Sequence, residues 1–186
     1  YPPTLANMKI QEDINERMRG ILIDWLIEVH LKFKLVPETL YLTANLIDRY
    51  LEIEPVRRDK LQLIGVTAML IACKYEEIYP PEVKDFVYIT DNAYTKQQIM
   101  DMEYTMLKKF NFNVTVISSY RFSERFNKLS QDSESTFFLC QYMLELALVE
   151  YKMIKYRPSM LAGGALYLAH KIMGKSDSWP LKVEQY

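Results

Sequence analysis

Histidine and cysteine, the side chains most often used for acid–base and nucleophilic chemistry, each occur only twice in this chain of 186 residues. His30 and His170 lie far apart in the sequence, and Cys73 and Cys140 each sit inside an apolar run. The sequence contains no GxGxxG, GxxxxGK[ST], HExxH, GxSxG or CxxC motif. We therefore expect both histidines to be packing or surface residues, and we predict a protein that is not an enzyme and holds no metal or cofactor.

Pairing of opposite charges is the chemistry that the sequence does support. Arg19 faces the same helical sector as Ile23 and Leu26, where a guanidinium needs a carboxylate, and Asp48 is the expected partner. Such a pair would be structural rather than catalytic. A second charged cluster, Lys74-Tyr75-Glu76-Glu77, ends an apolar helix. Charges at a helix C-terminus are usually solvated, with the lysine complementing the helix dipole. This cluster can therefore be explained as solvated charges as well as by a functional role.

Helices must position these residues, because apolar residues recur at helical spacing along almost the whole chain and the breaking residues fall between these segments. Pro37 and Pro81 stand where the first turn of a helix accepts proline, and Thr95-Lys96-Gln97-Gln98 has the form of a capping box. No stretch alternates with a period of two for long enough to indicate a strand. The predicted class is all-α, with helices over about 13–35, 38–52, 58–76, 81–88, 95–109, 119–129, 134–152 and 158–173.

An internal repeat relates these helices to one another. When the sequence is shifted by 97 residues, Ile64–Lys74 falls on Leu161–Lys171 without a gap, and Asp48 falls on Glu145. Each copy has an acidic position on one helix and then a helix rich in small residues, which suits the centre of a bundle. The alternative is that two amphipathic helices align by chance. A fifth helix of the first copy begins near Thr95, so its counterpart would begin near position 192, and we expect the second bundle to be incomplete here.

The first predicted helix carries two apolar stripes, whereas a helix on the surface of a globular protein needs only one. One stripe contains Met18, Ile21, Leu22, Trp25 and Val29, and nearly opposite lie Ile23, Ile27 and Leu31. Either this helix is wholly buried, or one stripe stays exposed as a docking patch. Glu28 borders the first stripe, which favours a ligand that is both apolar and basic.

The composition weighs against several classes of protein. Lys and Arg total 23 against 24 Asp and Glu, so the net charge of −1 does not indicate nucleic acid or an anionic membrane as a partner. No apolar run approaches the roughly 18 residues of a membrane span, and Tyr1-Pro2-Pro3 does not begin a signal peptide. Two cysteines predict a reducing compartment rather than a disulfide scaffold. Because the chain opens without an initiator Met, we expect an excised piece of a longer polypeptide.

Several segments together carry a resemblance to a known family. The first is Met18-Arg19-Gly20-Ile21-Leu22-Ile23-Asp24-Trp25-Leu26, and it is followed by Leu46–Leu51, Lys60–Gly65, Lys74–Pro81, Asp85–Asp91 and Met102-Glu103. The first segment resembles the MRAIL-x-DWL signature of the cyclins, and the others follow in the cyclin order. The resemblance runs from about Asp13 to about Tyr186. Asp13–Arg19 and Tyr120–Phe126 look most like a mitotic B-type cyclin, with the A type close behind.

The resemblance implies two tandem cyclin boxes, each a bundle of five helices in the full family. A lead-in segment would cover 1–17, the first box 18–113 and an incomplete second box 114–186. The implied function is that of a non-catalytic regulatory subunit that binds and activates a cyclin-dependent kinase and recruits substrates at the G2/M transition, in the nucleus and cytoplasm. The implied partners are that kinase, as a heterodimer, and proteins with Arg-x-Leu motifs, with no nucleic acid, membrane or cofactor.

The resemblance also implies roles for individual residues, carried over by position. Lys74 and Glu103 would bond the backbone of a mobile helix in the small lobe of the kinase. The apolar seat for that helix would consist of Ile71, Tyr75, Leu107, Phe112 and Val114. The docking patch for Arg-x-Leu motifs of substrates and inhibitors would consist of Met18, Ile21, Leu22, Trp25, Glu28, Leu61 and Gln62. Arg19 and Asp48 match a buried ion pair of the family.

Other functions remain as alternatives, and two departures from the family pattern stand out. The alternatives are an A-type cyclin with a role in S and G2 phases, a cyclin-box transcription factor, and an enzyme. A DNA-binding cyclin box should be basic and usually follows a zinc ribbon, neither of which fits this sequence. Gly20 replaces the usual alanine of the signature, at a cost of about 1 kcal/mol in helix propensity, so the first helix is expected to be looser. We expect that the family's helix before the first box is missing from this chain, which would bear on its affinity for the kinase.

Overall fold

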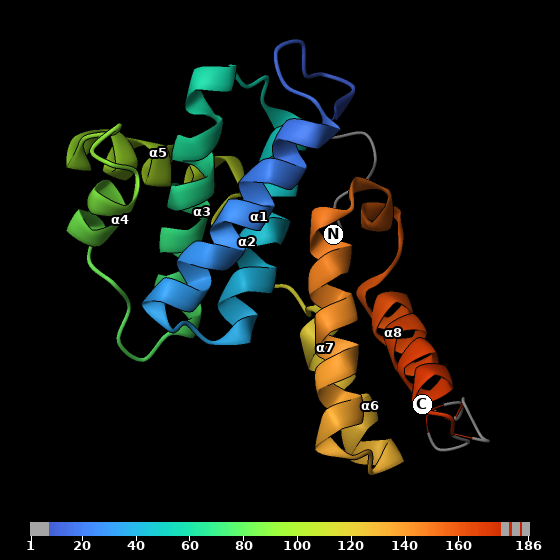
Figure 1. Cartoon of the computed structure of the whole chain (residues 1–186). Helices are drawn as coiled ribbons and strands as arrows, with labels where there is room; N and C mark the ends of the chain where they lie inside the picture. The colour runs from blue at the N-terminus through green and yellow to red at the C-terminus, as the bar shows by residue number, and fades with distance from the viewer. Residues whose placement is uncertain (1–7, 176–178, 180–182, 184–186) are drawn as a thin grey trace. The chain divides into compact units, whose positions relative to one another are not determined.

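The computed structural model describes residues 8–175, 179 and 183 of the chain. Across these residues the secondary structure is helical and contains no strand, which confirms the predicted all-α class (Figure 1). The α-helices are α1 (Glu16–Phe33), α2 (Pro37–Ile53), α3 (Leu61–Glu76), α4 (Val83–Ile89), α5 (Lys96–Lys109), α6 (Ser119–Ser130), α7 (Glu134–Val149) and α8 (Pro158–Ile172). The 3-10 helices η2 (Arg58–Lys60) and η3 (Tyr151–Lys155) precede α3 and α8.

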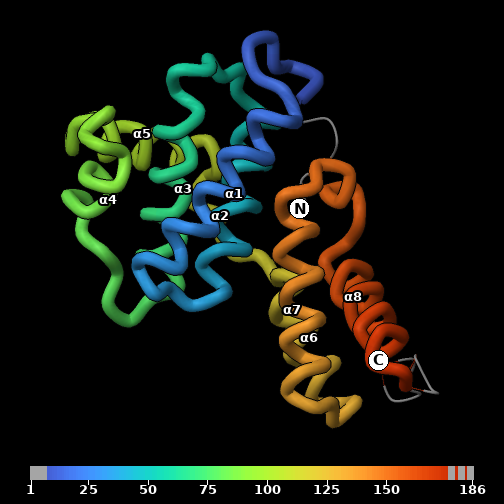
Figure 2. The backbone as a smooth tube through the Cα atoms, viewed as in Figure 1, coloured from blue at the N-terminus to red at the C-terminus, as the bar shows by residue number. Residues whose placement is uncertain are grey.

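The chain divides into two compact units, Tyr1–Val116 with α1 to α5 and Ile117–Tyr186 with α6 to α8. The backbone of each unit can be followed in Figure 2. The 97-residue repeat relates α2 to α7 and α3 to α8, because the shift carries the first residues of α2 and α3 onto those of α7 and α8. This agreement of helix boundaries confirms that the repeat is structural, and the chance alignment is excluded.

Helix α3 forms the centre of the first unit. From Leu63 to Cys73 every residue of α3 is buried, and α1, α2, α4 and α5 pack around it. Small residues at positions 65, 68 and 72 let these neighbours approach closely. In the second unit α8 has the corresponding place and packs against α6 and α7 through a buried face that includes Ala162, Ala165, Leu166 and Ala169.

The residues just before α1 pack onto the first unit. The Gln11 side-chain amide donates to the carbonyl oxygens of Leu51 (2.8 Å) and Glu54 (2.7 Å), and its oxygen accepts from the Val56 backbone N–H at 2.8 Å. Ile14 is buried. These contacts hold the chain across the end of α2, so this part of the predicted lead-in segment belongs to the first unit.

Local hydrogen bonds set several helix ends where the sequence prediction missed them. The Asn15 side chain accepts from Met18 N–H at 3.0 Å, so α1 begins at Glu16. Pro81 was expected inside a first turn, but this prediction is wrong: Glu82 and Asp85 form a capping box and α4 begins at Val83. The helix predicted over 58–76 divides into η2 and α3, and the one over 134–152 divides into α7 and η3. The predicted capping box of Thr95 with Gln98 is confirmed, and so is the prediction that Pro37 lies in the first turn of a helix.

Candidate functional site

A charged pair marks the end of the central helix of the first unit. Lys74, in the last turn of α3, donates from Nζ to both carboxylate oxygens of Glu103 on α5, at 2.7 and 2.8 Å. The Lys74 side chain is 48% exposed and that of Glu103 is 13% exposed. An ammonium group has three donors and a carboxylate several acceptor positions, so each group keeps capacity for further hydrogen bonds. The pair can therefore serve free backbone carbonyl and N–H groups of another chain.

Exposed apolar side chains surround this pair. On α5, Met100, Tyr104 and Leu107 share a face with Glu103, because residues three and four apart are neighbours on a helix. Met100 and Tyr104 are exposed, and Leu107 is half-buried. The sequence analysis did not include Met100 and Tyr104, although their spacing from Glu103 and Leu107 would have indicated them. We call Lys74, Tyr75, Met100, Glu103, Tyr104, Leu107 and Phe112 the α3/α5 surface.

The five residues expected to form the apolar seat differ in exposure. Tyr75 and Phe112 are exposed, whereas Ile71 and Val114 are buried within the first unit. Because α3 is central, Ile71 faces the core, so it and Val114 support the surface from below and offer little area to a partner. That the five residues together form the seat of a kinase helix stays a prediction. The Tyr75 hydroxyl lies 2.7 Å from Thr115 Oγ1, which fixes the ring against the chain that follows α5.

Phe112 has an unusual backbone conformation. Its φ of 57° places it in the left-handed region, and its side chain is 66% exposed. Bulky residues rarely adopt this conformation, and such strain tends to gather at functional positions. A hydrogen bond from Phe112 N–H to the Leu107 carbonyl at 2.8 Å holds the turn. The turn thus presents an aromatic ring next to the end of α5 instead of burying it.

Glu77 ties the end of α3 to the start of α2. Its Oε1 accepts from Val36 N–H at 2.8 Å and from the Thr39 hydroxyl at 2.6 Å. Val36 is the N-cap residue of α2 and makes no side-chain cap, and Glu77 satisfies its backbone N–H at this helix end. The interpretation of the 74–77 cluster as solvated charges is therefore wrong for Glu77, which has a structural role beside the α3/α5 surface.

The structure contains the predicted ion pair between α1 and α2. Arg19 donates from Nε to Asp48 Oδ1 at 2.6 Å and from an Nη to Asp48 Oδ2 at 2.7 Å, in a bidentate arrangement. Both residues are buried. Burial raises the pKa of the Asp48 carboxyl, and the charge and hydrogen bonds of Arg19 oppose this rise. Since the pair is sealed from solvent, its role is to join α1 to α2.

The expected docking patch lies on α1 and α3, but its residues differ in accessibility. Ile21 and Glu28 are exposed, and Met18, Trp25 and Gln62 are half-buried. Leu22 and Leu61 are each 6% exposed and belong to the core. The sequence left open whether Met18, Leu22 and Trp25 are exposed or buried, and the structure buries Leu22 while Met18 and Trp25 stay half-buried. On the opposite side of α1, Ile23 is buried and Leu31 is exposed, so neither stripe is wholly buried or wholly exposed.

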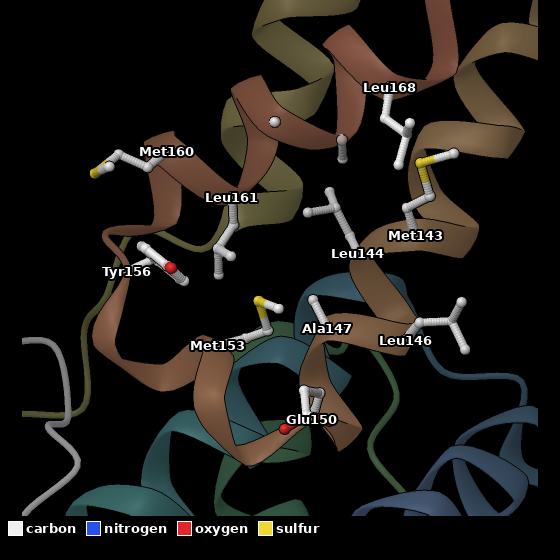
Figure 3. Close-up of a pocket in the computed structure, with 12 residues that line it drawn as sticks. Met143, Leu144, Leu146, Ala147, Glu150, Met153, Tyr156, Met160, Leu161 and Leu168 are labelled. Atoms are coloured by element: carbon white, nitrogen blue, oxygen red, sulfur yellow. The ribbon is translucent and has the colours of Figure 1, made fainter. Parts of the chain in front are cut away.

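The second unit has an apolar groove between α7, η3 and α8, with a volume of about 520 Å³ (Figure 3). Met160 and Leu168 of this groove are 58% and 49% exposed, whereas their repeat counterparts Leu63 and Ile71 are 3% and 4% exposed. In the first unit, α5 packs on α3, the repeat counterpart of α8. Residues of the second unit at positions equivalent to buried ones of the first are therefore left exposed in the groove. Its lining residues are Met143, Leu144, Leu146, Ala147, Glu150, Met153, Tyr156, Met160, Leu161, Gly164, Ala165 and Leu168.

Both histidines are buried packing residues, as expected. His30 Nε2 lies 3.1 Å from the Val36 carbonyl oxygen. His170 Nε2 lies 2.8 and 2.9 Å from the two oxygens of Asp132, which also accepts hydrogen bonds from Ser130 and Lys175. Sequence reasoning missed this cluster, because Asp132 lies in a polar connection and its partners are about forty positions further on. The cluster joins the turn between α6 and α7 to the end of α8.

The cysteines are free and buried. Burial, with a smaller contribution from a nearby carboxylate, raises the pKa of both Cys73 and Cys140 to about 12. Both thiols are thus protonated and unreactive at neutral pH. No group of three or more His, Cys, Asp or Glu in the described part of the chain is placed to hold a metal ion, and no helix there is long and apolar enough to cross a membrane.

Two family models match this arrangement of two helical units. The model described as "Cyclin, N-terminal domain" matches residues 1–115, and "Cyclin, C-terminal domain" matches residues 117–186. The chain therefore belongs to the cyclin family.

The relatives that this chain resembles in sequence carry the names of B-type cyclins. It is 54% identical over 177 residues to "Cyclin-B2-1" of Oryza sativa subsp. japonica, covering 95% of this chain and 42% of the relative. It is 50% identical over 179 residues to "G2/mitotic-specific cyclin-B" of Marthasterias glacialis, covering 96% and 46%. The chain thus spans less than half the length of these B-type relatives. A viral cyclin from herpesvirus saimiri has the same fold, with a TM-score of 0.83, 19% identity, and coverage of 93% of this chain and 76% of that chain.

A kinase complex also contains this fold. The yeast RNA Pol II CTD kinase CTDK-1 complex includes a chain that matches with a TM-score of 0.78 and 12% identity, covering 91% of this chain and 60% of that chain. At such identities the likeness concerns the fold alone.

Proposed function

We propose that this chain is the kinase-binding part of a B-type cyclin, a regulatory subunit that activates a cyclin-dependent kinase at entry into mitosis. The observation that carries this proposal is the Lys74–Glu103 pair set among exposed apolar side chains on the α3/α5 surface. The B-type names of its relatives, one of them described as G2/mitotic-specific, support the assignment of the type and timing.

The α3/α5 surface is suited to hold the end of a helix from the kinase. Helix ends leave backbone N–H and carbonyl groups without partners inside the helix. Lys74 would donate to such a carbonyl and Glu103 would accept from such an N–H, while Tyr75, Phe112 and the exposed face of α5 would bury apolar area. The cyclin would perform no chemistry itself. It would activate the kinase by binding the active position of that helix more tightly than the inactive one.

A second surface would recruit substrates. The patch of Met18, Ile21 and Trp25 on α1 combines apolar area with the exposed carboxylate of Glu28. A peptide with an Arg-x-Leu motif offers a matching leucine and guanidinium. Binding there would raise the local concentration of a substrate near the kinase without taking part in the phosphoryl transfer.

The remaining assignments are also proposals. We propose that the protein acts in the nucleus and cytoplasm, and its free buried cysteines support a reducing compartment. An A-type role in S and G2 phases is the second candidate. A cyclin-box transcription factor is disfavoured by the net charge of −1, since a DNA-binding domain gains most of its affinity from basic residues.

Co-purification with a panel of cyclin-dependent kinases, followed by a phosphorylation assay, tests the proposed function. We expect this chain to form a stable complex with at least one kinase of the panel and to raise its activity on a short peptide substrate. Failure to bind any kinase while the chain is fully folded would contradict the proposal. Tight binding to duplex DNA without kinase binding would favour the transcription-factor alternative.

A further inference from the structure

The connection between α3 and α4, residues 77–82, carries the most exposed tyrosine in the described part of the chain (Figure 1). Tyr79 is 91% exposed, and Ile78 before it is 85% exposed. The Tyr79 side chain enters no hydrogen bond or ring contact with any other described residue. Two large apolar side chains held in water beside each other add nothing to the core, so their exposure indicates an external partner.

Both ends of this connection are fixed to the first unit. Glu77 accepts from the Val36 backbone N–H at 2.8 Å, and at the other end Glu82 and Asp85 form the capping box of α4. Only the tip, residues 78–81, is left without such contacts. The tip is therefore presented to solvent by two anchored helices.

The backbone at the tip is biased toward an extended conformation. Tyr79 precedes Pro80 and Pro80 precedes Pro81, and a residue before proline is disfavoured in the helical region. Among the described tyrosines that are more than half exposed, Tyr79 alone lies outside a helix. The others are Tyr88 in α4, Tyr104 in α5 and Tyr142 in α7.

Carboxylates lie on both sides of the tyrosine. Glu76 is three residues before Tyr79, and the exposed Glu82 is three residues after it. Protein kinases choose their substrates partly by the charges around the acceptor residue. An acceptor between two carboxylates is complementary to a substrate cleft lined by basic side chains.

We propose that Tyr79 is a phosphorylation site for a protein tyrosine kinase with a basic substrate cleft, and that its phosphate opposes binding of the cyclin-dependent kinase. In the transfer, the phenol oxygen of Tyr79 attacks the γ-phosphorus of ATP. The new O–P bond forms as the bond to the bridging oxygen of the leaving ADP breaks, and the catalytic aspartate of the tyrosine kinase takes the phenol proton. The modified side chain carries a charge of about −1.5 to −2 at neutral pH.

The phosphate would stand at the edge of the α3/α5 surface, so the effect on binding rests on the proposed function. Tyr79 follows Lys74 by five residues, and Lys74 would donate to free carbonyl groups at the end of a kinase helix. Free carbonyl groups belong to the C-terminal end of a helix, which carries about half a negative charge. A phosphate dianion repels this helix end, so phosphorylation lowers the affinity of the chain for the cyclin-dependent kinase.

Mass spectrometry tests the site after the folded chain is incubated with ATP, Mg²⁺ and the catalytic domain of a tyrosine kinase that prefers acidic peptides. We expect Tyr79 to be phosphorylated at least about tenfold faster than Tyr142, because a helical residue must unfold locally before it can enter a substrate cleft. Tyr142 is the matched control, since it is 59% exposed but lies within α7. Equal rates at the two tyrosines, or no phosphate on Tyr79, would overturn the site.

A charge variant tests how the site is recognised. Glu76→Gln together with Glu82→Gln removes both flanking charges, and the glutamine at position 82 keeps an oxygen that can cap α4. We expect the rate of phosphorylation of Tyr79 to fall by about tenfold at low salt. An unchanged rate would show that the carboxylates do not direct the tyrosine kinase, and would overturn the basic cleft.

Titration of the cyclin-dependent kinase with the phosphorylated and the unmodified chain tests the effect on binding. We expect phosphorylation to weaken binding by about threefold to tenfold. Tyr79→Phe, passed through the same treatment, should bind as the untreated wild type does. Equal affinity of the two forms would overturn the regulatory effect. If the unmodified chain binds no cyclin-dependent kinase, the proposed function has failed and the regulatory effect with it, whereas the site itself is decided by the mass spectrometry.

Discussion

Arg19 shows how one residue can determine the packing of two helices. Its guanidinium carries a charge into a region where both partners are almost fully buried, and the bidentate pairing with Asp48 satisfies that charge. A buried pair of this kind contributes little beyond a well-packed apolar pair, but removal of one partner leaves the other charge stranded. The join between α1 and α2 is therefore more sensitive to single substitutions than to a matched replacement of both residues.

Arg19→Ala should destabilise the protein by about 3–5 kcal/mol, because Asp48 would remain buried without its partner. Urea unfolding followed by circular dichroism measures this change. Arg17→Ala, two positions earlier on the exposed side of α1, is the control and should change stability by less than about 0.5 kcal/mol. An unfolding midpoint of Arg19→Ala equal to that of the wild type would contradict the structural role of the pair.

Ile21 and Leu22 are adjacent in the sequence but should respond differently to truncation. Ile21 is 61% exposed, so Ile21→Ala leaves no cavity and should spare stability while reducing phosphorylation of substrates that carry an Arg-x-Leu motif. Leu22→Ala should cost about 2–5 kcal/mol because it opens a cavity over Gly65. Thermal unfolding and kinase assays on motif-bearing and motif-free peptides measure both effects. An equal loss on the two peptides for Ile21→Ala would rule out a docking patch at this residue.

The sequence predicted charge pairs only where their surroundings were apolar. Arg19 stood out because Ile23 and Leu26 share its helical sector, and Asp48 on the next predicted helix was the expected carboxylate partner. The bond from Glu77 to Val36 and Thr39 could not be found in the same way, since a charged residue at a helix end ordinarily faces water. The sequence left the burial of Leu22 open, because helical periodicity gives the direction of a side chain but not the distance to the next helix.

At the scale of elements, Glu77 holds the end of α3 in place. The last turn of α3 carries Lys74 and Tyr75, so their positions depend on how this end is attached. The Glu77 carboxylate accepts from the Val36 backbone N–H and the Thr39 hydroxyl at the start of α2 and thereby ties the two helix ends together.

Glu77→Ala should lower the free energy of unfolding by about 0.5–2 kcal/mol, the usual effect of losing a helix cap. Glu77→Gln keeps an oxygen acceptor and should lose less than the alanine variant. Chemical unfolding of the two variants beside the wild type measures the difference. If both variants unfolded like the wild type, the hydrogen bonds of Glu77 would have to be exchangeable for water.

Helix existence was easier to predict than helix ends. Periodic apolar residues located α1 to α8 because each helix buries one face against a neighbour. The ends depend on side chains that accept from backbone N–H groups, and Glu82 is an uncommon cap, so the start of α4 was placed too early at Pro81. The break between α7 and η3 arises at Glu150, whose own side chain accepts from Lys152 N–H and ends the helical spacing.

At the scale of the whole molecule, each unit has its own central pair of helices, α2 with α3 in the first and α7 with α8 in the second. The helices that pack on these pairs differ between the units. The repeat predicted this relationship from small residues in α3 and α8, and the helix boundaries confirm it. It could not predict the cluster of Asp132, His170 and Lys175, which has no counterpart among the aligned positions. In the second unit, hydrogen bonds within this cluster connect the turn before α7 to the end of α8.

The stability of the second unit should therefore depend on pH through the ionisation of Asp132. Burial raises the pKa of this carboxyl, but hydrogen bonds from Lys175, Ser130 and His170 outweigh that effect and hold it below the ordinary value. A lowered pKa in the folded state stabilises the protein above the unfolded pKa of about 3.9, and this contribution is lost as the pH falls through the folded pKa. Asp132→Asn should thus be less stable than the wild type by about 1–3 kcal/mol at pH 7, and the difference should begin to shrink as the pH falls below about 4 and vanish only below the lowered pKa of the folded state.

Thermal unfolding of the wild type and Asp132→Asn between neutral pH and about pH 3 measures this dependence. Asp24→Asn, which removes an exposed carboxylate from the first unit, is the control and should follow the wild type throughout. A difference between Asp132→Asn and the wild type that stays constant with pH would contradict the ionised state of Asp132.

The central claim is that the α3/α5 surface activates a kinase, and the double variant Lys74→Ala with Glu103→Ala tests it most directly. An exposed pair contributes at most about 1 kcal/mol to stability, so the melting temperature should fall by no more than about 2–4 °C. Two charged hydrogen bonds to the kinase are worth about 1.5–3 kcal/mol each, so affinity for the kinase should fall by about 100-fold or more.

The matched control removes another exposed ion pair of the same unit, with Arg57→Ala and Asp59→Ala together. We would measure kinase activity on a short, motif-free peptide at a fixed concentration of each folded variant. The account predicts activity lost in the Lys74/Glu103 variant and retained in the Arg57/Asp59 variant. Normal activation of the kinase by a folded Lys74/Glu103 variant would contradict it.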